Sequence, residues 1–361
     1  MSQLVKFNSV SKSNVSNVDF NNIPFGKIFT DHMFVADYFD GQWCNFEICP
    51  VHKLEIHPGN LAWHYGQSIF EGMKASITKD RVPLLFRPEM HAKRLNFSAR
   101  RMCMPEFPED IFINAVHTLV NLEQNWIPPQ KGSALYIRPF MIAMDEAIGV
   151  RASDTYKFII FTMPVGPYYS KPVNLYAQDQ YVRAVVGGVG EAKTAGNYAA
   201  SLYPANIAKK EGYDQVMWLD GIHKKYVQEV GTMNIFFVIN DEVITPNLDG
   251  AILSGITRDS VLKILKDQGN KIIERQISID EIMEAGKNGQ LKEVFGTGTA
   301  AVIAQVDKIK YKDQIVQLDP ANWKYSTMLK NYINDLREGS VEDTYGWTVP
   351  ARNAFNVTKQ L

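Results

Sequence analysis

The chain has 361 residues, more than one hydrophobic core usually serves, so its length favours two domains. Its 38 basic and 39 acidic residues leave a net charge of -1, which argues against a nucleic acid or an anionic membrane as partner. The three cysteines (Cys44, Cys49 and Cys103) lack metal-type spacing and predict a reduced, cytoplasmic protein. No run approaches the roughly eighteen apolar residues that a membrane span needs. The Ser/Asn-rich start, residues 1–20, is expected to be an arm without a leader sequence.

The first half of the chain mixes strand-like and helix-like patterns. The predicted strands are Met33–Tyr38, Pro83–Phe86, Ala134–Ile142 and Lys157–Met163, and the predicted helices are His91–Met102 and Asp110–Gln124. Three prolines and a glycine then fall within residues 164–172, a composition typical of a linker. We therefore expect a small α/β domain over residues 1–166, a linker over 167–177 and a large α/β domain over 178–361.

The second half carries two glycine-rich loops at predicted strand ends. Its predicted strands are Tyr181–Val186, Val216–Leu219 and Asn234–Ile239, and its predicted helices are Asn197–Lys210 and Arg258–Gln268. Ser278 and Glu281 form a capping-box pattern for a further helix. Strands and helices in both halves indicate an α+β (α/β) fold of two domains, with the functional site in the cleft between them.

Lys193 lies in the most informative segment, Gly187-Gly188-Val189-Gly190-Glu191-Ala192-Lys193-Thr194-Ala195-Gly196. A lysine on a glycine-lined floor can approach a flat ligand and form an imine with its aldehyde. The same segment nearly matches a phosphate-binding loop, but Ala192 stands where that loop needs its second glycine. A β-carbon there obstructs the amides that wrap a phosphate. A Schiff-base enzyme, a nucleotide-binding module and a solvated lysine remain the alternatives at this point.

Glu229 precedes a glycine turn and an apolar strand, in Gln228-Glu229-Val230-Gly231-Thr232-Met233. It could be a solvated loop charge. Beside a pyridine ring, however, a carboxylate keeps the ring nitrogen protonated, so that the ring can accept electrons from a substrate carbanion.

Two segments are candidates for anion binding. Ser254-Gly255-Ile256-Thr257-Arg258 begins a predicted helix, and helix N-termini bind phosphate through free amides and the helix dipole. Gly296-Thr297-Gly298-Thr299-Ala300 offers a second group of amides. Together with the glycine-lined lysine, these segments indicate a phosphorylated cofactor.

Four motifs follow one another along the chain: Glu191-Ala192-Lys193-Thr194-Ala195-Gly196-Asn197-Tyr198, Glu229-Val230-Gly231-Thr232-Met233-Asn234, Gly255-Ile256-Thr257-Arg258 and Phe295-Gly296-Thr297-Gly298-Thr299-Ala300. Together they resemble the motifs of the branched-chain amino acid aminotransferases. These enzymes belong to fold type IV of the pyridoxal 5'-phosphate (PLP) enzymes. The first half agrees through Phe70-Glu71-Gly72-Met73-Lys74 and Tyr136-Ile137-Arg138-Pro139. The resemblance covers nearly the whole chain after about residue 20.

The resemblance implies a role for individual residues. Lys193 would form the imine with PLP and then move the substrate proton. The implied cofactor-binding residues are Arg94, Lys193, Tyr198, Glu229, Ile256, Thr257 and Thr299. The implied substrate-binding residues are Phe25, Tyr65, Phe70, Tyr136, Arg138, Tyr168, Thr232 and Ala300.

Among them, Glu229 would pair with the pyridine nitrogen and Tyr198 with the phenolic oxygen. Arg94, with Ile256, Thr257 and Thr299, would hold the phosphate, and Thr232 with the Ala300 amide would receive the substrate carboxylate. The aromatic residues would wall an apolar pocket, with Arg138 placed for the distal carboxylate of glutamate.

The resemblance therefore implies reversible transfer of the amino group of leucine, isoleucine or valine to 2-oxoglutarate, giving glutamate and branched-chain 2-oxo acids. It also implies a homodimer. The nearest alternative is a sister enzyme of the same fold, a D-amino acid aminotransferase or an aminodeoxychorismate lyase. A nucleotide-binding module and a non-catalytic cofactor-binding protein are the others.

Overall fold

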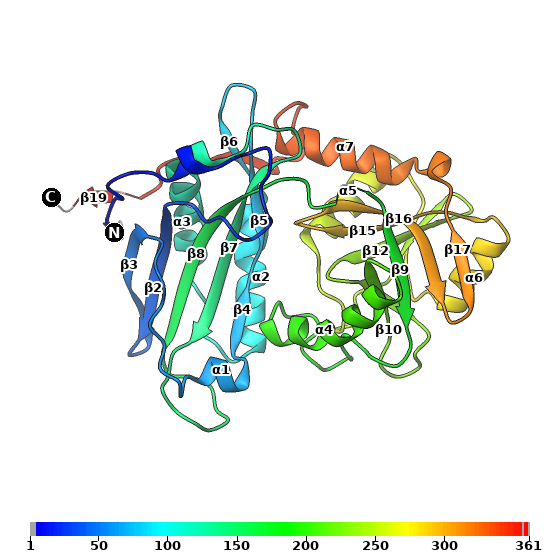
Figure 1. The fold of residues 1–361 in the computed structure, drawn as a ribbon, viewed down its shortest axis with the longest axis horizontal. Coiled ribbons are helices and arrows are strands. Elements are labelled where there is room, and N and C mark those ends of the chain that lie inside the picture. The colour runs from blue at the N-terminus through cyan, green and yellow to red at the C-terminus, as the bar shows by residue number, and fades with distance from the viewer. Residues whose placement is uncertain (1–4, 170, 356, 360–361) are drawn as a thin grey trace. The chain divides into compact units, whose positions relative to one another are not determined.

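The computed structural model describes residues 5–169, 171–355 and 357–359, so Ser170 of the expected linker lies outside the described residues. The chain divides into two compact units (Figure 1). Unit 1 comprises Met1–Tyr168, Lys193–Ala195 and Asn334–Leu361, and unit 2 comprises Tyr169–Ala192 and Gly196–Ile333. The C-terminal segment thus belongs with the first unit, whereas the expected large domain included it. The expected domain boundaries themselves stay a prediction.

Unit 1 is built on a mainly antiparallel sheet in the order β18-β6-β5-β7-β8-β2-β3-β1-β19, with β4 paired to β7. Its strands are β1 (Val5–Phe7), β2 (His32–Phe39), β3 (Gln42–Pro50), β4 (Ser68–Phe70), β5 (Met73–Ile77), β6 (Pro83–Phe86), β7 (Ala134–Ala143), β8 (Tyr156–Val165), β18 (Thr348–Pro350) and β19 (Val357–Lys359). Its helices are α1 (Leu61–Tyr65), α2 (Pro88–Arg101) and α3 (Glu109–Leu122), with short 3-10 turns at Val15–Asn17 and Gln124–Trp126.

Helices α2 and α3 pack on one face of this sheet and close the core of unit 1 (Figure 1). Alternation along the strands decides which side chains join that core, because successive residues point to opposite faces. Along β5 and β7, Met73, Ala75, Leu135 and Ile137 belong to the core. Their neighbours Lys74, Tyr136 and Arg138 therefore lie on the opposite face, which is the face that carries the predicted substrate residues.

Unit 2 contains a mixed sheet in the order β11-β10-β9-β16-β15-β12-β13-β14, with β17 paired to β16. Its strands are β9 (Val173–Gln178), β10 (Gln215–Leu219), β11 (Val227–Val230), β12 (Asn234–Ile239), β13 (Glu242–Thr245), β14 (Ile272–Glu274), β15 (Leu291–Gly298), β16 (Val302–Tyr311) and β17 (Gln314–Gln317). Its helices are α4 (Ala195–Lys210), α5 (Ile256–Asp267) and α6 (Ile279–Lys287), with a 3-10 turn at Pro320–Asn322. Helix α7 (Tyr325–Arg337) begins in unit 2 and ends in unit 1. No helix in the described part of the chain is long and apolar enough to cross a membrane.

The mixture of helices and sheets confirms the predicted α+β fold class. Nearly all predicted elements are present within a few residues of their expected ends, including the helix capped by Ser278, whose hydroxyl accepts the Glu281 amide. The strand predicted at Tyr181–Val186 is wrong, because these residues form no ladder. Arg183 instead bonds through its guanidinium to the carbonyls of Gly190 and Ala251, which folds the segment into an irregular loop.

Candidate active site

Lys193 is held in place by its own backbone. Its carbonyl accepts the Phe70 amide at 3.0 Å, and its amide donates to the Ser98 hydroxyl at 2.9 Å. The next residue, Thr194, donates its hydroxyl to the Ser68 carbonyl at 2.8 Å. The Lys193 amine then lies 4.9 Å from the centre of the Phe70 ring. Anchored to β4 and α2 in this way, the amine has a fixed starting position beside an aromatic surface.

Arg94 is oriented by a buried carboxylate. Its Nε and Nη2 donate to the two oxygens of Glu71 at 2.7 and 2.8 Å, a bidentate pair. His91, one turn earlier on α2, contacts Glu71 through Nδ1 at 2.7 Å. Burial acts to raise the pKa of Glu71, but Arg94 and His91 outweigh it and hold that pKa well below its ordinary range. Glu71 is therefore a permanent anion that fixes the guanidinium.

Arg138 lies among aromatic rings on the face of the unit 1 sheet opposite its core. Its guanidinium carbon is 4.6 Å from the Phe70 ring centre and 5.4 Å from that of Tyr136. Its Nη2 donates to the Tyr136 hydroxyl at 3.1 Å. A β-carbon on Gly72 would stand 2.1 Å from that hydroxyl, so only glycine permits this position of Tyr136. The structure thus brings Lys193, Phe70, Tyr136 and Arg138 together.

Phe25 and Tyr168 extend this aromatic group. The Phe25 ring lies edge-on to Tyr136 at 5.9 Å and to Tyr168 at 5.0 Å. Burial raises the pKa of the Tyr168 phenol. Tyr65 lies elsewhere, at the end of α1. It is 41% exposed, and its ring centre lies 6.2 Å from that of His64.

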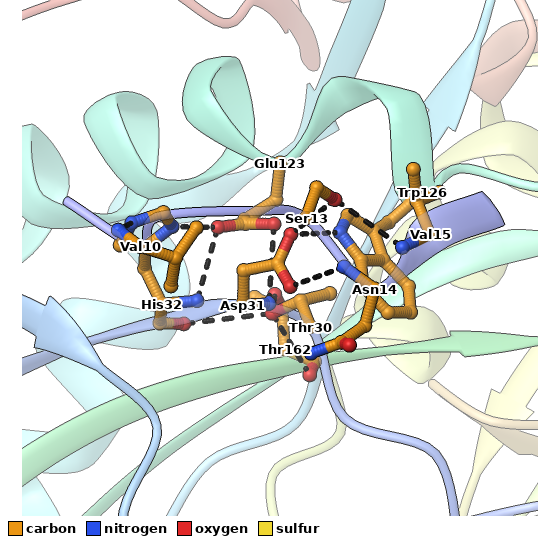
Figure 2. A network of polar contacts seen from close by, with 10 residues as sticks. All are labelled: Val10, Ser13, Asn14, Val15, Thr30, Asp31, His32, Glu123, Trp126 and Thr162. Atoms are coloured by element: carbon orange, nitrogen blue, oxygen red, sulfur yellow. Dashed lines mark hydrogen bonds and ion pairs between the residues drawn. The ribbon is translucent and has the colours of Figure 1, made fainter. Parts of the chain in front are cut away.

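Asp31 joins the two ends of the segment that carries Phe25, because it bonds to Ser13 and Asn14 (Figure 2). Asp31 accepts the Ser13 hydroxyl at 2.5 Å, the Asn14 amide at 3.0 Å and the Trp126 indole at 3.0 Å. Burial acts to raise the pKa of Asp31, but these hydrogen bonds lower it overall. Because Ser13 and Asp31 lie on either side of Phe25 in the chain, their contact closes the segment into a loop and limits where Phe25 can move.

His32 strengthens the same network from the next position (Figure 2). Its Nε2 accepts the Val10 amide at 3.2 Å, and its Nδ1 lies 2.6 Å from Glu123 at the end of α3. An Nε2 that accepts must carry no proton, so Nδ1 is the nitrogen that donates to Glu123. The N-terminal segment is therefore joined to α3 as well as to β2.

Unit 2 contains a small pocket, which is lined by Arg183, Asn197, Tyr198, Ser201, Glu229, Gly231, Thr232 and Leu253. Glu229 is 3% exposed, and its Oε1 accepts the Leu253 amide at 2.7 Å and lies 3.3 Å from Arg183 Nη2. Its carboxylate is thus fixed by a backbone amide and a guanidinium. Tyr198 and Thr232, both predicted site residues, line the same pocket.

The predicted phosphate-binding residues of unit 2 lie on two segments. Ile256 and Thr257 are buried in the first turn of α5, whose N-cap residue Gly255 provides no side-chain cap. A β-carbon on Gly255 would meet the Asn234 side chain at 1.9 Å, so this helix end requires a glycine. Thr299 and Ala300 form the turn between β15 and β16, and the buried hydroxyl of Thr297 beside them has no hydrogen-bond partner among the described residues.

The glycine loop before Lys193 is not built as a phosphate-binding loop. No strand leads into it, and the Gly190 carbonyl accepts Arg183. A β-carbon on Gly190 would stand 2.2 Å from the Ala251 carbonyl oxygen, so this glycine serves packing. The nucleotide-binding alternative loses its structural basis.

Several functional neighbours were not predicted from the sequence. They are Glu71, His91, Ser98, Arg183 and Leu253. The i, i+3 spacing of His91 and Arg94 places both on one helix face and could have indicated a shared partner. The sequence holds no signal that the partner is Glu71.

Each unit contains groups that suit a phosphorylated aldehyde of a pyridine. Unit 1 provides an anchored amine and an oriented arginine. Unit 2 provides a buried carboxylate, a phenol and a helix N-terminus without a side-chain cap. The buried Thr297 hydroxyl and Arg183 Nε, which have no partner among the described residues, add polar capacity in unit 2.

Comparison with known proteins agrees with this chemistry. The family model for amino-transferase class IV matches residues 68–309. Branched-chain-amino-acid transaminase 1 of Bacillus subtilis is 49% identical over 92% of this chain and 95% of its own. A branched-chain aminotransferase of Thermoproteus uzoniensis with norvaline has a TM-score of 0.73 at 25% identity, covering 89% of this chain and 100% of that one.

A branched-chain amino acid aminotransferase of Escherichia coli has a TM-score of 0.70 at 25% identity, and covers 88% of this chain and 99% of its own. The family match covers more than half of the chain, and the relatives extend it to nearly the full length. This chain belongs to the class IV aminotransferases, the two-domain enzymes of fold type IV.

Proposed function

We propose that this protein is a branched-chain-amino-acid aminotransferase, which transfers the amino group of leucine, isoleucine or valine reversibly to 2-oxoglutarate. The observation that carries the proposal is the anchored Lys193 amine beside Phe70, whose ring also stacks on Arg138. Aromatic walls suit a branched apolar side chain, and one guanidinium among them suits the distal carboxylate of glutamate. A single pocket can thus accept both substrates without burying an unpaired charge.

PLP is the cofactor, and when bound it withdraws electrons from the substrate α-carbon. Lys193 would hold the cofactor covalently and then carry the proton to and from that carbon. Glu229, fixed by Leu253 and Arg183, would keep the pyridine nitrogen protonated. Tyr198 would donate to the phenolic oxygen.

The phosphate would be held by charge and by backbone amides. Arg94 keeps its orientation through Glu71, so it offers a fixed cation. The first turn of α5, with Ile256 and Thr257, would contribute amides and the positive end of the helix dipole. Thr299 would add a hydroxyl from the turn after β15.

Substrate recognition would be divided between a carboxylate site and a side-chain site. Thr232 and the Ala300 amide would receive the α-carboxylate. Phe25, Phe70, Tyr136, Tyr168 and Tyr65 would wall the side-chain site, and Arg138 would meet the distal carboxylate of glutamate. The closed segment that carries Phe25 supports this division, because it holds one aromatic wall in place.

A homodimer in the cytoplasm completes the proposal. The loop after β7 exposes Ile148 by 69% and Val150 by 88%, although Asp145 braces it through the Thr155 amide and hydroxyl. A braced loop with exposed apolar side chains suits contact with a second copy. Tyr65, exposed at the end of α1, would serve the pocket through such a contact. The three free cysteines support a reducing compartment.

A substrate panel tests the function against the sister enzymes of the same fold. Purified protein loaded with PLP should form glutamate from 2-oxoglutarate with L-leucine, L-isoleucine and L-valine. It should form none with D-alanine and release no pyruvate from aminodeoxychorismate. Activity with D-alanine alone would assign the chain to the D-amino acid aminotransferases instead.

A further inference from the structure

Asn234, the first residue of β12, belongs to the same sequence motif as Glu229 and Thr232 but has no role in the proposed site. Its side chain is buried, with 5% of the residue exposed. Ile235 and Phe237, on the alternate positions of the strand, belong to the core of unit 2. Because successive side chains of a strand point to opposite faces, Asn234 lies on the other face of the sheet.

The backbone of Leu253 is held on two sides. Its amide donates to Glu229 Oε1 at 2.7 Å, and its carbonyl accepts Asn234 Nδ2 at 2.8 Å. A carbonyl can only accept a hydrogen bond, so the Asn234 atom that faces it is the amide nitrogen. The residue that fixes Glu229 is therefore itself fixed by Asn234.

Asn234 also contacts the start of α5. Gly255, two residues after Leu253, is the N-cap of this helix, and a β-carbon on it would stand 1.9 Å from Asn234 Oδ1. The first-turn amides of α5 are the groups that would hold the phosphate, and no side chain caps them. One buried side chain thus touches both the segment that holds Glu229 and the helix end, and all of these residues belong to unit 2.

We propose that Asn234 is a positioning residue, which sets the spacing between Glu229 and the first turn of α5. The proposal rests on the proposed function, in which these two groups hold the pyridine nitrogen and the phosphate of the cofactor. A ligand that carries both groups at a fixed distance binds more tightly when the protein already holds their partners at the matching distance. Without the Asn234 amide, the Leu253 amide keeps its bond to Glu229, whereas the start of α5 loses its attachment to β12. The contribution of the phosphate to binding should therefore fall more than that of the ring.

Calorimetric titration of the full-length apoprotein with pyridoxamine 5'-phosphate and with pyridoxamine tests this spacing. The two probes differ only in the phosphate, and neither has an aldehyde that reacts with lysines. Asn234→Leu removes the amide, keeps nearly the same size and adds no charge. It should reduce the ratio of the two affinities by about 10- to 100-fold, with the affinity for pyridoxamine nearly unchanged.

Asn270→Leu is the matched control, because Asn270 Nδ2 donates to the Leu265 carbonyl at 3.1 Å near the opposite end of the same helix. It should leave the ratio of affinities unchanged. A ratio that Asn234→Leu retains, or a loss that both probes share equally, would overturn the proposal. If Asn234→Leu does not fold, Asn234→Asp takes its place. It keeps the shape but sets an oxygen against the Leu253 carbonyl, so the same loss is expected and the same results would count against it.

The substrate panel separates this proposal from the proposed function. A parent chain that prefers pyridoxamine 5'-phosphate but transaminates none of the branched-chain substrates would overturn the function and leave the role of Asn234 intact. A parent chain that binds the two probes equally would overturn the role of Asn234, since unit 2 would then have no phosphate site to position.

Discussion

Replacing Glu71 by glutamine removes the charge that Arg94 faces while keeping the size of the side chain. Glu71 is completely buried, and the side chain of Arg94 is only 10% exposed, so the pair is screened very little by water. Breaking a buried pair by removing one partner costs about 3–5 kcal/mol, because the remaining charge stays buried and uncompensated. For a folding unit of this size, that cost corresponds to a fall in melting temperature of roughly 6–20 °C.

Urea denaturation of the parent chain and of Glu71→Gln, both without added cofactor, measures this cost. Glu106→Gln is the matched control, because it breaks an arginine–glutamate pair in the same unit whose side chains are 57% and 50% exposed. Exposed pairs contribute about 0–1 kcal/mol, so the control should unfold almost like the parent. If Glu71→Gln lost no more stability than Glu106→Gln, Glu71 would not be the anion that fixes Arg94.

Three further predictions concern single side chains. Arg138→Ala should slow the glutamate half-reaction by about 10- to 100-fold and the leucine half-reaction much less, because only glutamate presents a distal carboxylate. Single-turnover kinetics measures both rates. Equal losses would place Arg138 outside the substrate site. Asp31→Ala should lower the free energy of unfolding by about 1–3 kcal/mol, since it leaves the buried Trp126 indole without its acceptor, and a change below about 0.5 kcal/mol would contradict the anchoring role. Burial lowers the pKa of Lys74 to about 7, so the unfolded chain binds more protons between that pH and about 10.5, and the free energy of unfolding should rise with pH across this window. Lys74→Met should flatten that rise, and an unchanged slope would show that Lys74 is not responsible.

The fold class and most elements could be predicted because they depend on local patterns. Short strand-like runs placed β6 and β12 at their observed ends, and the capping box placed the start of α6. The error at Tyr181–Val186 has a physical cause. Its apolar run suits a strand, but the Arg183 guanidinium donates to the carbonyls of Gly190 and Ala251, and the chain turns instead of joining a ladder.

The site could be predicted only in part, because its motifs name residues but not their partners. The motif that contains Glu71 did not predict its role as the partner of His91 and Arg94, since these residues lie 20 and 23 positions further along the chain. The burial of Arg337, the last residue of α7, also had no signal in the sequence. A charged residue at a helix end is ordinarily solvated, and only the tertiary structure shows that this one is buried.

The covalent attachment of the cofactor to Lys193 is the claim on which the proposed function depends most. Borohydride reduction of the PLP-loaded enzyme, followed by peptide mass mapping, measures it directly. The added mass should fall on the peptide that contains Lys193, and the Lys193→Ala variant should carry none. A label on another lysine, or a parent chain that takes up no label, would contradict the assignment.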